Sequence, residues 1–95
     1  MSEKRIKEEE EKLKINQMKL EEINEEIEYI NKKIMRCNKR LEAINEDNLE
    51  EFIEYLNLLS SCYSDLSKNI TAKICILKNN KYCKNTIEFW KVGTV

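Results

Sequence analysis

The sequence contains no proline and no histidine, and its one glycine is Gly93, near the C-terminal end. Because proline and glycine break helices and build turns, their scarcity predicts long helices with few sharp reversals. Without histidine, no side chain has an ordinary pKa near neutrality, and a cysteine nucleophile would lack its usual base. One glycine cannot build a phosphate-binding loop. We therefore expect no catalytic residues, no cofactor and no enzymatic activity.

Metal-ligand spacing is also missing. The chain has four cysteines, Cys37, Cys62, Cys75 and Cys83, but no C-x-x-C pair. Zinc sites need closely paired ligands, so we expect no bound metal. The N-terminal segment MSEKRIKEEEEK is charged throughout, unlike a secretory signal peptide. These features favour reduced thiols in the cytoplasm or nucleus.

Long apolar runs are absent as well. The longest is Ile74-Cys75-Ile76-Leu77, whereas a membrane-spanning helix needs about 20 apolar residues. Charged residues make up 37% of the chain and hydrophobic residues 41%. This balance is too apolar for a disordered chain and too charged for a compact globule. It predicts soluble helices with one buried stripe and a wide solvated face.

A seven-residue repeat runs from Leu20 to Asp47 and reads LEEINEE, IEYINKK, IMRCNKR, LEAINED. Its first and fourth positions hold Leu20, Ile23, Ile27, Ile30, Ile34, Cys37, Leu41 and Ile44. Alternating spacings of three and four place these residues on one helical face and imply left-handed supercoiling against a partner. The frame extends backwards more weakly, with Glu9 and Asn16 in the fourth position.

The fifth position of every repeat is asparagine. We call Asn24, Asn31, Asn38 and Asn45 the Asn ladder. Two interpretations stay open. The amides either hydrogen-bond to a neighbouring helix and fix its register, or form a solvated polar flank.

The repeat breaks at residues 45–48, Asn-Glu-Asp-Asn, because Leu41 and Leu49 are eight residues apart. In one interpretation a turn follows, and Asp47 or Asn48 caps a second helix with a glutamate three residues on. In the other, one helix continues and absorbs the extra residue as a stutter. We favour the turn.

The second helix is expected over residues 49–77, with Asn79-Asn80 as its end. Its apolar stripe consists of Leu49, Leu56, Tyr63, Ile70 and Leu77, with Phe52, Leu59 and Leu66 three residues after the first three. The tail, 78–95, is expected to be a short helix or irregular. The prediction is thus an all-α, long antiparallel helical hairpin or coiled coil. It is a single unit over 1–95, with a first helix at about 3–45, a turn at 46–48, and an overhanging N-terminal arm.

The second helix carries more apolar side chains than one opposing helix can cover, and exposed apolar patches usually mark interfaces. We therefore expect a scaffold or interaction subunit that assembles with itself or with other helical chains into a bundle of three or four helices. The expected interface consists of Leu20, Ile23, Ile27, Ile30, Ile34, Leu41, Ile44, Phe52, Leu56, Leu59, Leu66, Ile70, Leu77 and Trp90.

An alternative function is binding to nucleic acid or to an acidic surface. Residues 68–95 carry six lysines and one acidic residue, with Tyr82, Phe89 and Trp90 among them. Basic and aromatic groups together grip phosphates and stack on bases. Against this, the segment has no arginine and the whole chain has a pI near 5.6, whereas nucleic-acid-binding domains are usually strongly basic. We expect protein helices as partners in preference to nucleic acid.

The layout of a short chain with two helices and Trp90 soon after the second resembles small subunits of the fungal DASH kinetochore ring complex. It also resembles small helical subunits of tethering or scaffold assemblies. The resemblance covers mainly residues 49–92 and implies a role as such a subunit. No functional residue is carried over from it.

Overall fold

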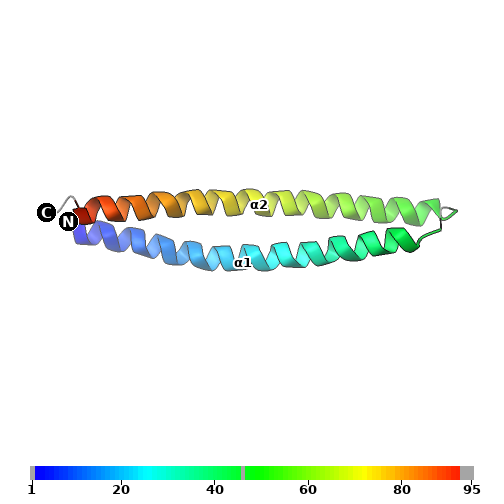
Figure 1. Cartoon of the computed structure of the whole chain (residues 1–95), viewed down its shortest axis with the longest axis horizontal. Helices are drawn as coiled ribbons and strands as arrows, with labels where there is room; N and C mark the ends of the chain where they lie inside the picture. The colour runs from blue at the N-terminus through cyan, green and yellow to red at the C-terminus, as the bar shows by residue number, and fades with distance from the viewer. Residues whose placement is uncertain (1, 46, 93–95) are drawn as a thin grey trace. The chain divides into compact units, whose positions relative to one another are not determined.

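The computed structural model describes residues 2–45 and 47–92, which form two helices, α1 (Ser2–Ala43) and α2 (Leu49–Val92) (Figure 1). The protein is all-α, and its helices are the two arms of an antiparallel hairpin, as predicted. Contacts divide the described chain into two units. The hairpin unit comprises residues 24–71. The terminal unit comprises residues 2–23 and 72–92.

In α1 the heptad positions are the buried ones. Those of the hairpin unit are Ile27, Ile30, Ile34, Cys37 and Leu41, and the pattern continues to Ile44 just after the end of α1; all six are buried or half-buried. Those of the terminal unit are Ile6, Glu9, Leu13, Asn16, Leu20 and Ile23. The same 3–4 spacing holds through both sets, because a helix with this repeat keeps one face against its neighbour. The weak N-terminal extension of the repeat therefore packs against α2, and the predicted overhanging arm is wrong.

The face of α2 that packs on α1 also follows a heptad. In the hairpin unit it consists of Phe52, Tyr55, Leu59, Cys62, Leu66 and Asn69. In the terminal unit it consists of Lys73, Ile76, Asn80, Cys83, Ile87 and Trp90. In each repeat, the first residue shares the packed face with the residue three positions later, as Phe52 does with Tyr55. The predicted stripe instead combined Phe52 with Leu49, three positions earlier. The packed face is therefore rotated from the expected one, and Leu49 is exposed.

The densest packing in the hairpin unit surrounds Ile30. Ile30 is completely buried and forms a cluster with the buried Ile34 and Cys62. The half-buried Leu59 and Leu66 pack against this cluster. Full burial of one such aliphatic side chain contributes roughly 1.5–3 kcal/mol. A few layers of this kind hold α1 and α2 together.

The connection between the helices is a turn, so the stutter interpretation is wrong. Asn45 accepts two hydrogen bonds, from the Asn48 backbone N–H at 2.9 Å through its carbonyl and from the Asp47 N–H at 3.4 Å through its side chain. Asn48 is the N-cap of α2, because its carbonyl accepts the first helical hydrogen bond, from Phe52 at 3.1 Å. Glu46 lies outside the described residues.

The predicted helix end at Asn79-Asn80 is also wrong, since α2 continues to Val92. Asparagine is a moderate helix residue whose side chain often competes for backbone hydrogen bonds. Here both amides are engaged elsewhere, because each accepts a 2.8 Å hydrogen bond from Asn16 Nδ2 on α1. The expected tail over 78–92 is therefore helical, while 93–95 lie outside the described residues. That 1–95 is one coiled-coil unit stays a prediction.

Candidate functional site

Over residues 2–45 and 47–92, neither helix is long and apolar enough to cross a membrane. The same residues hold no group of three or more His, Cys, Asp or Glu side chains suited to a metal ion. The surfaces of the two helices carry further candidate sites.

An exposed apolar row on α2 is the most prominent of these surfaces, and we call it the outer stripe. It consists of Leu49, Ile53, Leu56, Tyr63 and Ile70 in the hairpin unit, and of Ile74 and Leu77 in the terminal unit. These side chains are 42–62% exposed. Their spacings are again those of a heptad, with Ser60 and Ser67 at the two intervening positions. With 3.6 residues per turn, the outer stripe lies roughly 100° around α2 from the face that packs on α1.

The two edges of the hairpin-unit seam differ in character. One edge is closed by Arg40, whose Nη2 lies 2.6 Å from Glu51 Oε1 and whose guanidinium stands 5.9 Å from the Tyr55 ring centre. The hydrogen bond to Glu51 raises the pKa of Arg40, which stays positively charged. A hollow next to this pair is lined by Lys33, Arg36, Cys37, Arg40, Tyr55 and Leu58.

The opposite edge holds the Asn ladder. In an antiparallel pair, fifth-position residues of both helices lie on one edge and seventh-position residues on the other. Arg40 and Glu51 occupy seventh positions, so the exposed Asn24, Asn31 and Asn38 lie on the other edge. On α2 that edge carries Leu56, Tyr63 and Ile70 of the outer stripe. In the hairpin unit, the side-chain amides of the Asn ladder on α1 thus lie along one side of the outer stripe.

The expected interface residues divide into two groups. The seven from residues 20–44 lie in the chain's own seam, together with four from α2: Phe52, Leu59, Leu66 and Trp90. The remaining three, Leu56, Ile70 and Leu77, lie in the exposed outer stripe. Only this second group is accessible to another chain without opening the hairpin.

A buried polar cluster in the terminal unit was not predicted. Glu9 is 0% exposed, and its Oε1 accepts a 3.1 Å hydrogen bond from Lys12 Nζ. Hydrogen bonds from Cys83 and Lys12 hold the pKa of Glu9 below its ordinary value. Burial, followed by the contact with Glu9, raises the pKa of the Cys83 thiol. Glu9 Oε2 has no hydrogen-bond partner among the residues that the structure describes.

Asn16 extends this cluster by donating hydrogen bonds to Asn79 and Asn80 of α2, and the Cys83 thiol lies 3.6 Å from Asn79 Oδ1. The signal for the cluster was in the sequence, because Glu9 and Asn16 occupy positions that are apolar in the later heptads. Buried polar groups require hydrogen-bond partners, so Glu9 and Asn16 at these positions predict polar residues on the facing helix.

Two cysteines also meet in the hairpin unit. Cys37 and Cys62 are both buried, and burial together with the neighbouring Cys62 raises the pKa of Cys37. They behave as small core residues, as expected of Cys37. Cys75 is exposed.

The C-terminal turns of α2 carry exposed basic and aromatic groups. Lys78, Lys81 and Lys84 are exposed, as are Tyr82 and Phe89. Trp90 is half-buried, and its ring meets that of Phe89 edge-to-face with centroids 5.7 Å apart.

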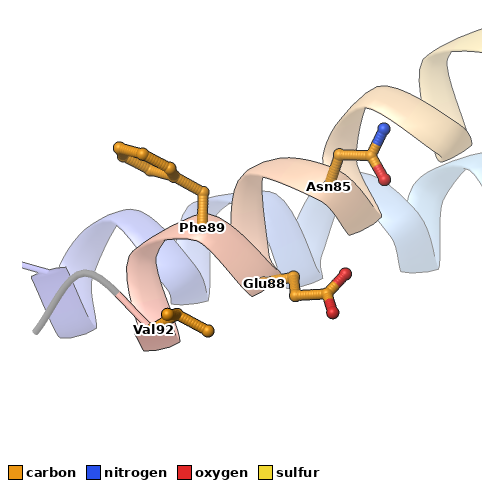
Figure 2. Close-up of a pocket in the computed structure, with 4 residues that line it drawn as sticks. All are labelled: Asn85, Glu88, Phe89 and Val92. Carbon is orange, nitrogen blue, oxygen red and sulfur yellow. The ribbon is translucent and has the colours of Figure 1, made fainter. Parts of the chain in front are cut away.

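A shallow surface hollow nearby is lined by Asn85, Glu88, Phe89 and Val92 (Figure 2). All four residues come from successive turns of α2, and the Phe89 ring extends away from the helix. This is a feature of one helix surface with mixed chemistry, and it brings together no catalytic set of groups.

No protein-family model, no curated protein and no solved structure matches the chain. The resemblance to DASH subunits therefore depends on the layout of the sequence alone. The outer stripe holds most of the exposed leucine and isoleucine side chains of α2.

Proposed function

We propose that this protein is a non-catalytic interaction subunit that binds a further helix along the outer stripe of α2. The observation that carries the proposal is the second heptad on α2, which is exposed while the first packs on α1. A helix that packs on one side only needs one apolar stripe and is otherwise polar. Two heptads on one helix are typical of a helix with two neighbours.

The energetic argument follows from the size of the outer stripe. Six of its seven members are leucine or isoleucine, and each is between two-fifths and two-thirds exposed. Complete burial of such a side chain contributes roughly 1.5–3 kcal/mol relative to full exposure, so covering the exposed halves of six yields several kcal/mol. A continuous apolar row of this kind usually marks a protein interface.

Assembly into a bundle of three or four helices, with the chain itself or with other helical chains, is the arrangement that supplies this cover. The reduced, mostly buried cysteines suit the cytoplasm or nucleus. A subunit of a kinetochore or tethering complex is one setting in which such a hairpin would work.

The test compares three forms of the tagged chain in its source cells. Leu56→Glu with Ile70→Glu places charges in the outer stripe without touching the seam. Met18→Glu is the matched control, because Met18 is exposed on α1. We expect the double variant to lose the associated proteins, or its own oligomers in light scattering, while the control keeps them and both stay helical by circular dichroism. Equal association of all three forms would refute the proposal.

A second function is supported by the exposed lysines and aromatic rings at the end of α2. They would bind nucleic acid or another acidic surface. Replacement of Lys78, Lys81 and Lys84 by glutamate should then abolish binding to single-stranded nucleic acid, and binding should weaken steeply as salt rises. Association through the outer stripe should respond little to salt.

A further inference from the structure

We infer that the helix covering the outer stripe is α2 of a second copy of this chain, paired antiparallel about a two-fold axis near Ser64. The inference rests on the proposed function, because it names the occupant of the same surface. Three features of α2 carry it: the charge gradient along the helix, the register of the flanking polar residues, and the sizes of the side chains in the stripe.

The charge gradient favours an antiparallel pair of identical helices. The beginning of α2 carries Glu50, Glu51 and Glu54, and the part from Lys68 onward carries six lysines and one glutamate. Two parallel copies would place acidic groups against acidic groups and lysines against lysines. Two antiparallel copies place each acidic end beside a basic end, which is the complementarity that steers association and selects orientation.

The residues that flank the outer stripe define a register. At seven-residue spacing they are Glu50, Asn57, Ser64, Thr71 and Lys78, and all five are exposed. A two-fold axis at Ser64 sets Glu50 of each copy opposite Lys78 of the other. It sets Asn57 opposite Thr71, and the two Ser64 side chains face each other. Registers shifted by one heptad lose the Glu50–Lys78 pair.

The same register matches the sizes of the stripe residues. Ile53 of one copy faces Leu77 of the other, and Leu56 faces Ile74. Nearer the two-fold axis, large side chains of one copy meet small side chains of the other. Ser60 faces Ile70, and Ser67 faces Tyr63. Alternating large and small residues let facing helices interdigitate without voids or clashes.

The angle between the two seams indicates the form of the assembly. Two neighbours separated by roughly 100° around α2 suit a four-helix bundle, in which each helix has neighbours about 90° apart. In such a bundle the second seam is bordered by the Asn ladder edge of each hairpin unit. The exposed Asn24, Asn31 and Asn38 then supply hydrogen-bonding groups at that border.

The test uses a short bis-maleimide on the purified 95-residue chain in which Cys75, the exposed cysteine, is replaced by serine. Adding Ser64→Cys places one thiol at the axis, and we expect covalent dimers. The matched variant Asn57→Cys places the thiol one heptad away, opposite Thr71, and we expect it to stay uncross-linked. Combining Asn57→Cys with Thr71→Cys should restore the dimers.

A charge-exchange series gives an independent measurement. Sedimentation should show that Glu50→Lys alone and Lys78→Glu alone each raise the dimer dissociation constant by roughly three- to tenfold, since exposed ion pairs are modest and the dimer holds two. The chain carrying both changes re-forms both pairs and should return to within about twofold of the wild type.

The outcomes separate this inference from the proposed function. Equal cross-linking of the Ser64→Cys and Asn57→Cys variants would show a parallel or non-specific pair and overturn the inference. The wild-type chain could instead be monomeric alone and bind a different protein, with that binding lost in the variant Leu56→Glu with Ile70→Glu. This result would refute the pairing with a second copy and leave the proposed function intact. If that double variant changes no association, both the pairing with a second copy and the proposed function are refuted.

Discussion

The Glu9 carboxylate faces the Cys83 thiol across the seam of the terminal unit, and neither residue is exposed to solvent. A buried carboxylate is costly unless its charge is compensated. Here Lys12 lies 3.1 Å away and Arg5 3.9 Å away, both on α1. The seam is thus held together by apolar layers in the hairpin unit and by a polar, charge-compensated layer in the terminal unit.

The pH dependence of stability should report this contact. Because the pKa of Glu9 is lower in the folded protein than its ordinary value of 4.5, its ionised form stabilises the folded state above that pH. The contribution is lost as the pH falls through the lowered pKa. We expect the melting temperature of the wild type to fall more steeply than that of Glu9→Gln between about pH 5 and about pH 3.

Exposed Glu10 provides the control for this measurement. Glu10→Gln should follow the wild-type curve. If Glu9→Gln also follows it, the ionised carboxylate does not contribute to folding in the way the structure indicates.

The four cysteines should differ sharply in reactivity. Burial raises the pKa of Cys37 and of Cys83, which lowers their thiolate fraction, whereas Cys75 is exposed. In native conditions alkylation followed by mass spectrometry should modify Cys75 first, and in urea all four should react. Native alkylation of Cys83 as fast as Cys75 would show that the terminal unit is open in solution.

A cavity at the centre of the hairpin unit should be strongly destabilising. Ile30→Ala removes a fully buried side chain, and we expect a loss of about 2–5 kcal/mol in urea unfolding. Met18→Ala, at an exposed position on α1, should change the free energy of unfolding by less than about 0.5 kcal/mol. Similar values for the two variants would contradict the packing around Ile30.

The start of α2 offers a smaller effect. Asn48 caps the helix, and its Nδ2 donates a 2.7 Å hydrogen bond to Glu51. Asn48→Ala should cost about 1 kcal/mol, and Asn48→Ser, another residue favoured at the N-cap, a few tenths. Chemical denaturation distinguishes the two, and equal losses would show that the cap contributes nothing specific.

Much of α1 could be predicted because its repeat is a property of one helix. Leu20 through Ile44 recur at 3–4 spacing, and that periodicity alone identifies the buried face. The turn was also predictable, because Asn48 with Glu51 three residues later is a typical helix start. In each case the signal lies within a short stretch of sequence.

The buried face of α2 was not predictable in the same way. Phe52, with its repeats Leu59 and Leu66, can pair with the residue three positions earlier or three positions later, and apolarity favours the earlier. The structure uses the later, which in the terminal unit brings Cys83 to Glu9 and Asn80 to Asn16. Matching of polar residues across two helices depends on pairs far apart in the chain, which the periodicity of one helix does not reveal.

The end of α2 was missed for the same reason. Asn79 and Asn80 stop many helices, but here both amides are bonded by Asn16 from the facing helix. The two seven-residue patterns of α2 interleave along the same stretch of sequence. We therefore expected one apolar stripe where the helix has two. The predicted stripe already contained Leu49, Leu56, Tyr63, Ile70 and Leu77 of the outer stripe, but only the packing of α2 on α1 shows that these residues are exposed.

Sedimentation equilibrium of the purified wild-type chain over a range of concentrations, beside Ile53→Glu with Ile70→Glu, tests the role of the outer stripe most directly. We expect the wild-type mass to rise with concentration toward twice 11.4 kDa, and the variant to stay at 11.4 kDa with unchanged helix content. A wild-type chain that remains at 11.4 kDa at every concentration, or a variant that associates equally well, would contradict self-association through α2.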